Sequence, residues 1–195
     1  MRLFVAVNLK DDERKKLYKA AAPLRKSGMP VRWVEPGSLH ITLKFLGEVR
    51  PQNVDAVMHA VSAVAAKAVP HDIKLAGFGA FPTIRRPRVI WAGAEAKPEL
   101  RSLKHDLEWE LAALGFEREL RAFQPHITLG RADEEAEAGL FRDLETLIGD
   151  IQYKSRIPIR QVDLMSSKLT ADGAKYELLG SVPVGMPEKQ RKATA

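Results

Sequence analysis

The tetrapeptide His40-Ile41-Thr42-Leu43 recurs as His126-Ile127-Thr128-Leu129. Both copies lie in apolar stretches rich in β-branched residues, which predicts a β-strand for each. Side chains of a strand alternate between its two faces, so the histidine and threonine of each copy share one face. The repeat therefore predicts two strands that each present one imidazole beside one hydroxyl.

The two copies are 126 − 40 = 86 residues apart, and further matches occur at the same offset. Residues 2–6 (RLFVA) fall on residues 88–92 (RVIWA), and Leu17 falls on Leu103 within helical stretches. A unit of strand, helix and motif strand thus occurs twice. Two similar units pack most simply about a pseudo-two-fold axis, which would bring the two histidines face to face across a cleft.

Hydrophobic spacing predicts the remaining elements. Apolar stripes at helical spacing predict helices after Pro51, between Pro98 and Gly115, and over residues 140–149, while Pro23 interrupts a first helix over residues 12–27. Strands are predicted near residues 3–9, 38–46, 72–79, 88–94, 125–131, 151–157, 160–168 and 175–182. The mixture indicates an α+β fold.

Composition restricts the class of protein. A chain of 195 residues with 45% hydrophobic and 29% charged residues predicts a single two-lobed domain over residues 1–184, followed by a basic, flexible tail at 185–195. The absence of cysteine excludes disulfides, thiolate metal sites and a cysteine nucleophile. The apolar N-terminus is too short for a signal peptide and no run could span a bilayer, so we expect a cytoplasmic protein without a membrane partner. We expect it to be a monomer.

Charge favours a polyanionic partner. The formal net charge is +6 and the sequence pI is about 9.6, and attraction to phosphate is long-ranged and largely independent of sequence. RNA is one such partner. The segment 82–88 (PTIRRPR) carries three arginines that could steer a nucleic acid, although an ordinary exposed loop is an equal alternative.

Two histidines suffice for acid–base chemistry on a phosphodiester. One neutral imidazole can accept a proton from water while the other, protonated, donates to the departing oxygen. Thr42 and Thr128 would donate to the non-bridging oxygens. A single strand histidine is more often structural, and threonine is a good strand former, but the duplication favours a site. His59, His71 and His105 lack such neighbours, and we expect them to be structural or solvated.

Two cations are further candidate phosphate contacts, each with a solvated surface role as the alternative. Lys44 shares the alternation of His40 and Thr42, whereas Arg131 falls off the alternation of His126 unless the strand bulges. A zinc hydrolase is disfavoured because no third ligand or His-Glu-x-x-His string accompanies the motifs, and no phosphate-binding glycine-rich loop is present. We therefore expect neither a metal nor a cofactor.

The chain resembles the 2H phosphoesterase superfamily, in particular the bacterial and archaeal RNA 2′,3′-cyclic phosphodiesterases once named 2′-5′ RNA ligases. The resemblance extends over nearly the whole chain. Besides the paired motifs, the strings that carry it are 2–6 (RLFVA), 32–34 (RWV), 39–47 (LHITLKFLG), 77–82 (GFGAFP), 87–91 (PRVIW), 125–129 (PHITL) and 173–177 (GAKYE).

The resemblance implies a bilobal, pseudo-two-fold fold with two antiparallel sheets flanking a central cleft and helices on the outer faces. It also implies metal-independent opening of a 2′,3′-cyclic phosphate to a 2′-phosphate. His40 would donate a proton to the leaving O3′, His126 would accept one from water, Thr42 and Thr128 would bind phosphate, and Arg131 matches a common basic position. Relatives tend to have an aromatic and an acidic residue where Met165 and Ser166 stand, which puts contacts from that segment in doubt.

Other functions remain open at this point. The same fold could join or cleave 2′-5′ linkages or act on small cyclic nucleotides, so the partner is an RNA 3′ end or a nucleoside cyclic phosphate. A non-catalytic RNA-binding module, in which the histidines only hold phosphate, is the alternative from a different class.

Overall fold

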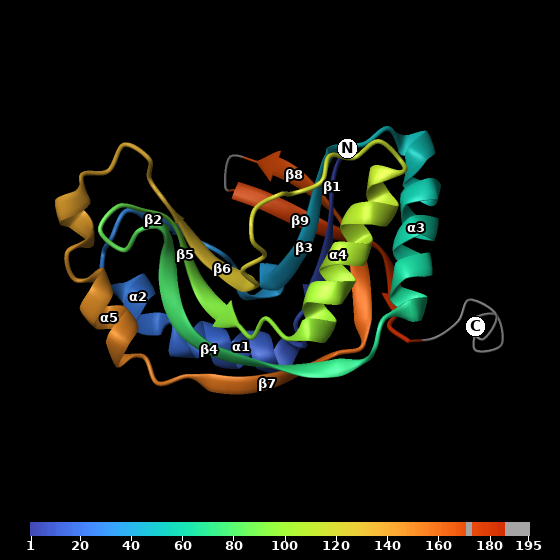
Figure 1. Ribbon diagram of the computed structural model, residues 1–195. Helices are drawn as coiled ribbons and strands as arrows, with labels where there is room; N and C mark the ends of the chain where they lie inside the picture. Colours follow the sequence, from blue (N-terminus) through green and yellow to red (C-terminus); the bar gives the residue numbers. More distant parts are fainter. Residues whose placement is uncertain (171–172, 186–195) are drawn as a thin grey trace.

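A curved antiparallel sheet dominates the computed structural model, which describes residues 1–170 and 173–185 (Figure 1). The described strands follow the order β7-β4-β5-β6-β3-β1-β8-β9, and β2 pairs with β6. The strands are β1 (Arg2–Asn8), β2 (Val31–Trp33), β3 (His40–Glu48), β4 (His71–Pro82), β5 (Pro87–Ala94), β6 (His126–Ala132), β7 (Lys154–Ile159), β8 (Gln161–Thr170) and β9 (Gly173–Pro183). The predicted tail lies, from residue 186 onward, outside the described residues.

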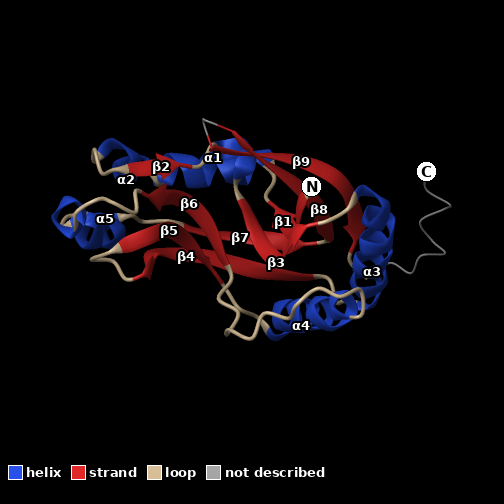
Figure 2. Cartoon of the chain, turned by 90° about the horizontal axis from the view of Figure 1, so that it is seen from above, coloured by secondary structure: helices blue, strands red, loops and turns tan. Residues whose placement is uncertain are grey.

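Helices lie around the periphery of the sheet (Figure 2). They are α1 (Asp11–Ala20), α2 (Ala22–Lys26), α3 (Val54–Lys67), α4 (Pro98–Ala112) and α5 (Leu144–Asp150), with short 3-10 helices at Pro36–Ser38, Pro51–Asn53 and Ala138–Phe141. Among residues 1–170 and 173–185, no helix has the length and apolar character needed to cross a bilayer.

The sheet consists of two halves that correspond in strand order. One half contains β7, β4, β5 and β6, and the other contains β3, β1, β8 and β9. Ile41 of β3 pairs with Ile127 of β6, and this pair joins the halves. The predicted α+β fold with antiparallel sheets is therefore confirmed, with the difference that the two expected sheets form one continuous sheet.

The halves exchange strands between the sequence repeats. β4, the last strand of the first repeat, pairs with β5 of the second repeat. In the other half β8 of the second repeat pairs with β1 at the N-terminus. Each half of the sheet thus contains strands from both repeats.

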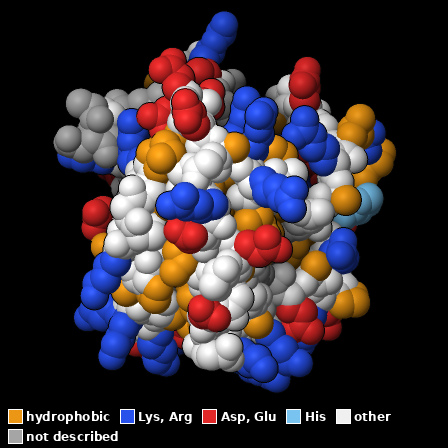
Figure 3. Space-filling view, turned by 90° about the vertical axis from the view of Figure 1, so that its left-hand side faces the viewer, with side chains coloured by type: hydrophobic (Ala, Val, Ile, Leu, Met, Phe, Trp, Pro, Cys, Tyr) orange, Lys and Arg blue, Asp and Glu red, His pale blue; other side chains and the backbone are white. Residues whose placement is uncertain are grey.

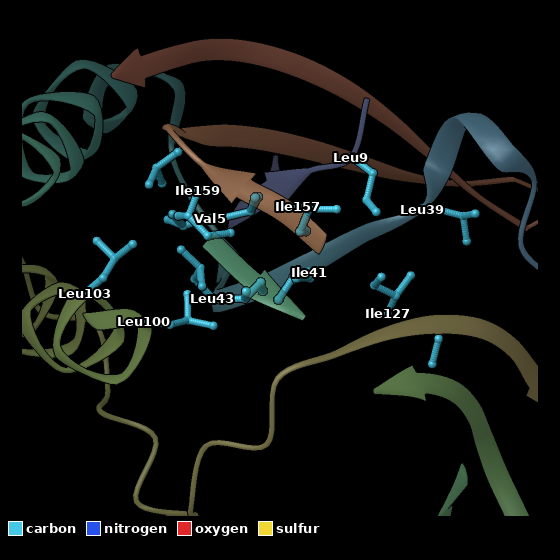
Figure 4. Packing of buried hydrophobic residues seen from close by; sticks show 14 of the residues in the cluster. Val5, Leu9, Leu39, Ile41, Leu43, Leu100, Leu103, Ile127, Ile157 and Ile159 are labelled. Carbon is cyan, nitrogen blue, oxygen red and sulfur yellow. The ribbon is translucent and has the colours of Figure 1, made fainter. Parts of the chain in front are cut away.

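The hydrophobic core lies between the sheet and the helices. Ile41 and Leu43 from β3 and Ile127 from β6 point into it, and Leu100 and Leu103 of α4 pack in the same cluster (Figure 4). These five side chains are almost completely buried. Because isoleucine and leucine of each motif face the core, the histidine and threonine of each motif face away from it.

The predicted elements are present, including the break at Pro23, with two local differences. Pro23 lies in the first turn of α2 and separates α2 from α1, as expected for a residue that lacks a backbone N–H. The predicted helix over 140–149 is divided into a 3-10 helix and α5. Strand β2 was not predicted, because three residues are too few for a pattern of alternation to be visible.

The predicted offset of 86 residues between residues 2–6 and 88–92 is wrong by one residue in the structure. Phe4 pairs with Phe45 of β3, whereas Val89 pairs with Arg131 of β6. Arg131 lies 131 − 45 = 86 residues after Phe45. Phe4 therefore corresponds to Val89, and the offset in these strands is 89 − 4 = 85 residues, because strand pairing rather than local similarity fixes the register.

Candidate active site

The two motif strands meet at the centre of the sheet. Ile41 pairs with Ile127 in antiparallel register, and continuing this register by one residue places His40 opposite Thr128 and His126 opposite Thr42. The four side chains share the face of the sheet opposite the core, which we call the histidine face. The two histidines are diagonal neighbours, a relation that separates backbones by about 7–8 Å.

Both imidazoles are held in the same way. Nδ1 of His40 lies 2.7 Å from the carbonyl oxygen of Ser38, and Nδ1 of His126 lies 2.7 Å from that of Gln124. A carbonyl oxygen can only accept a hydrogen bond, so Nδ1 carries the proton in each ring. Nε2 of each neutral histidine is consequently the atom available to accept or donate a proton.

Aromatic rings support each histidine. The ring of His40 lies 4.9 Å from Phe4 and 5.2 Å from Tyr176, measured between centroids. The ring of His126 lies 5.1 Å from Phe81 and 6.4 Å from Trp91. These contacts fix the orientation of the imidazoles and remove water from one side of each ring.

Burial and positive charge oppose protonation of both rings. Burial lowers the pKa of His40 to about 4, against the opposing effect of the Ser38 carbonyl, and the charges of Arg14, His126 and Arg131 lower this pKa further. Burial also lowers the pKa of His126, and Arg131 acts in the same direction. Both imidazoles are therefore neutral in the free protein at pH 7.

A polar pocket of about 310 Å³ adjoins His40. Its lining includes Asn8, Arg14, Gln161, Asp163 and Tyr176. The fully buried Asp163 carboxylate accepts hydrogen bonds from Asn8 Nδ2 (2.8 Å) and Gln161 Nε2 (2.9 Å). Asn8 Oδ1 in turn accepts one from Arg14 Nη2 (3.2 Å). This network holds a guanidinium beside the pocket.

These pocket residues were not predicted, although one sequence signal was present. Asp163 stands between the buried Val162 and Leu164, and Asn8 ends an apolar strand; a polar residue among buried apolar ones requires a partner. Met165, the departure from the related sequences, packs with Phe4 and Tyr176 and also lines the pocket. The segment whose contacts were in doubt is therefore part of the wall beside His40.

Thr42 and Thr128 lie on the histidine face, half-buried. Thr42 lies opposite Ala6 of β1, and Thr128 lies opposite Trp91 of β5. Within residues 1–170 and 173–185, neither hydroxyl bonds to another group of the protein. Both hydroxyls are thus available to a ligand bound between the histidines.

Matching bulges decide where the two candidate cations lie. In β3, Val5 pairs with Lys44 but Ala6 pairs with Thr42, so Leu43 is an extra residue. In β6, Ile90 pairs with Gly130 but Trp91 pairs with Thr128, so Leu129 is extra. Each bulge reverses the alternation beyond it.

The prediction for Lys44 is wrong for this reason. The bulge turns its side chain to the core, where Nζ lies 2.5 Å from Glu108 Oε2 and 2.7 Å from the Glu117 carbonyl oxygen. Lys44 is 3% exposed, so it cannot reach a phosphate on the histidine face. Burial tends to raise the pKa of Glu108, but hydrogen bonds from Lys104 and Lys44 hold it below its usual range.

The matching bulge at Leu129 of β6 brings Arg131 to the histidine face, which is the condition on which its prediction depended. Arg131 lies opposite Val89 of β5, and its charge lowers the pKa of both motif histidines. Phe45 occupies the equivalent position of the first repeat and is 68% exposed. The two halves of the site therefore differ, with a cation in one and an aromatic ring in the other.

The other histidines lie outside this site. His59 and His105 are exposed on α3 and α4, and His71 is buried at the start of β4 with Nδ1 2.8 Å from the Val69 carbonyl oxygen. The expectation of structural or solvated roles agrees with these positions. Within residues 1–170 and 173–185, no three His, Asp or Glu side chains gather as a metal site would require.

The paired strands, their histidines and the two-fold arrangement are those of a phosphoesterase, and comparison with known proteins identifies the family. The model of the family described as "LigT like Phosphoesterase" matches residues 7–91 and again residues 93–176. The two matches begin 93 − 7 = 86 residues apart, which equals the motif offset. The chain belongs to this family.

Individual relatives agree with this assignment. The RNA 2′,3′-cyclic phosphodiesterase of Archaeoglobus fulgidus is 41% identical over 184 residues, which cover 91% of this chain and 97% of that protein. The crystal structure of TT0787 of Thermus thermophilus is similar with a TM-score of 0.78 and 28% identity, covering 95% and 98% of the two chains. That of E. coli LigT complexed with 3′-AMP has a TM-score of 0.75 and 25% identity, covering 94% and 97%.

Proposed function

We propose that the protein is an RNA 2′,3′-cyclic phosphodiesterase that hydrolyses a terminal 2′,3′-cyclic phosphate to a 2′-phosphate. The observation that carries the proposal is the pair of equivalent histidines on neighbouring strands, each with Nδ1 bonded to a carbonyl and Nε2 available. The family and the names of its curated members support the same activity.

The reaction divides the work between the two rings. His126 Nε2 accepts a proton from water, whose oxygen forms the new bond to phosphorus while the P–O3′ bond breaks. His40 Nε2 donates a proton to O3′, which leaves as the 3′-hydroxyl. The product carries a 2′-phosphate. In-line displacement requires water and O3′ on opposite sides of phosphorus, and a phosphate bound between the two imidazoles would have one ring on each side.

Polar groups of the histidine face stabilise the phosphate. Thr42 and Thr128 donate hydrogen bonds to the non-bridging oxygens, and Arg131 supplies the compensating positive charge. These roles use two hydroxyls that bond to no other group among residues 1–170 and 173–185, and a guanidinium on the same face of the sheet. Lys44 has no such role, because its ammonium is bound to Glu108 in the core.

The low pKa of His40 fits an acid whose proton arrives with the substrate. A phosphate anion beside the ring favours the charged imidazolium, so binding raises the pKa of His40 from about 4 towards neutrality. His126 needs no such change, because its lowered pKa keeps it neutral and able to accept a proton. The two rings then differ in protonation although they are held alike.

The test is hydrolysis of an oligoribonucleotide ending in a 2′,3′-cyclic phosphate, in excess chelator, with the phosphate position of the product identified by phosphorus NMR. We expect turnover to a 2′-phosphate without added metal, and a loss of about 10²–10⁴-fold in His40→Ala and in His126→Ala. Turnover that requires added metal, or that survives in both variants, contradicts the mechanism. Binding without any turnover would instead indicate a non-catalytic RNA-binding module.

A further inference from the structure

A second arginine lies beside Arg131 on the histidine face. Arg32 of β2 pairs directly with Arg131 of β6 in antiparallel register. Directly opposite residues point to the same face, with Cβ atoms about 4.5–5.5 Å apart. The neighbours of Arg32 confirm this direction, because Val31 and Trp33 pack against the core on the other face. Arg32 and Arg131 are called the arginine pair below.

In the described part of the chain, no carboxylate neutralises the arginine pair. Both side chains are exposed, and within residues 1–170 and 173–185 neither guanidinium forms an ion pair with a carboxylate. Like charges directly opposite each other destabilise a sheet. Two adjacent, uncompensated guanidinium groups are well suited to binding a phosphate, which each can contact with two parallel hydrogen bonds.

General surface charge does not explain the pair. The end of the molecule that includes β2 and α5 carries Lys and Arg side chains from its upper part to its lower edge, and Asp and Glu lie among them (Figure 3). Positive and negative side chains are therefore mixed on this surface. The specific feature is the position of the pair on the same face as the histidines, with Arg131 in the strand that carries His126 and Arg32 in the strand paired with it.

The two arginines lie at different distances from the reacting phosphorus. The charge of Arg131 lowers the pKa of both motif histidines. Arg32 is one strand further out, on the side of β6 where β3 diverges and β2 pairs with β6 instead. Adjacent strands are about 4.8 Å apart. An anion held by both arginines consequently lies beside the reaction centre, where a second phosphate of the same ligand would be.

We propose that Arg32, together with Arg131, binds the internucleotide phosphate on the 5′ side of the terminal nucleoside. The inference rests on the proposed function and specifies its substrate class. The preferred substrate is then an RNA strand and not a free nucleoside 2′,3′-cyclic phosphate, which lacks this second phosphate. Arg32 is a binding residue for the strand and takes no part in proton transfer.

Kinetics on two substrates with the same 3′ nucleoside test the proposal. We expect Arg32→Gln to lower kcat/KM on the oligonucleotide about tenfold through KM, because one charged hydrogen-bonding partner is lost. On the nucleoside 2′,3′-cyclic phosphate the variant should equal the wild type. The plot of log kcat/KM against log salt concentration for the oligonucleotide should become shallower by about 0.7, the value for one phosphate contact on a single strand.

Arg156→Gln is the matched control. Arg156 of β7 is exposed and lies opposite Lys74 of β4, so it also belongs to a like-charged cross-strand pair. The control removes the same charge, but β5 and β4 lie between β7 and β6. We expect no change on either substrate. An equal loss in both variants would show general electrostatic attraction and overturn the proposal.

Further outcomes of these measurements are decisive. Equal loss on both substrates for Arg32→Gln, or no loss on either, overturns the proposal. Arg32→Lys keeps the charge without the planar guanidinium, so an intermediate KM on the oligonucleotide supports a phosphate contact. A lower unfolding midpoint in Arg32→Gln would indicate a structural role, whereas relief of repulsion predicts an equal or higher midpoint.

A binding measurement separates this proposal from the proposed function. Fluorescence anisotropy with a 5′-labelled oligoribonucleotide ending in a 2′-phosphate requires no turnover. A Kd about tenfold weaker for Arg32→Gln supports phosphate binding by the arginine pair, whether or not the wild type hydrolyses the cyclic phosphate. A lack of hydrolysis by the wild type would refute only the proposed function. An unchanged Kd overturns the arginine pair while hydrolysis by the wild type still stands.

Discussion

The unusual titration of His40 predicts a measurable dependence of stability on pH. In the folded protein, burial and neighbouring positive charge lower the pKa of His40 to about 4, whereas an unfolded chain returns it to about 6.5. The unfolded state therefore binds the proton first as pH falls. The resulting stability is fully present above pH 6.5 and is lost progressively as pH falls towards 4.

The magnitude follows from these two values. Between pH 8 and pH 4.5, a group with a pKa of 6.5 unfolded and about 4 folded removes about 2.5 kcal/mol from the free energy of unfolding. Carboxylates and His126 also titrate in this range, but they do so in every variant. Comparing the change between the two pH values in His40→Gln and in the wild type isolates the contribution of His40.

Urea denaturation at pH 8 and pH 4.5 measures this difference. We expect the wild type to lose about 2.5 kcal/mol more than His40→Gln on acidification. His59→Gln, a change at an exposed position of α3, is the matched control and should behave as the wild type. A difference below about 1 kcal/mol between the wild type and His40→Gln would refute the argument that burial suppresses protonation of His40.

Three further predictions concern the bulges and the walls of the site. Lys44→Met should lower the free energy of unfolding in urea by about 1.5–3 kcal/mol, because it removes a buried charged hydrogen bond to Glu108, which keeps Lys104 as a partner; lost turnover at unchanged stability would restore Lys44 as a phosphate contact. Gly79→Ala should destabilise the protein and lower kcat, because the new Cβ would lie 2.3 Å from the Trp91 indole; unchanged thermal unfolding and turnover would show that Trp91 moves freely. Arg131→Gln should shift the pH profile of kcat/KM to higher pH, since it removes a charge that lowers the pKa of both motif histidines. A pH profile that keeps its position while only KM rises would place Arg131 away from the rings.

Alternation made the centre of the site predictable from the sequence. Isoleucine and leucine of each motif had to be buried, so His40, Thr42, His126 and Thr128 had to share the other face of their strands. The repeat then placed the two pairs opposite each other. The helices and most strands followed from the same local patterns, because their hydrophobic faces repeat within a few residues.

Pairing between strands limited the prediction beyond that centre. The bulges at Leu43 and Leu129 exist only in relation to β1 and β5, so alternation alone put Lys44 on the wrong face and left Arg131 conditional. The pocket depends on a bond between Asn8 and Asp163, which are 155 residues apart. No local pattern identifies such a partner, although a buried aspartate signals that one exists.

The pairing of β1 with β8 also determines when the site can form during synthesis. His40 leaves the ribosome well before Met165 and Tyr176, which complete its surroundings. A nascent chain therefore carries both motif histidines while the wall beside the first is still missing. Contacts over such sequence separations form slowly. A chain that stops short of Tyr176 retains both histidines but lacks the enclosure that lowers the pKa of His40.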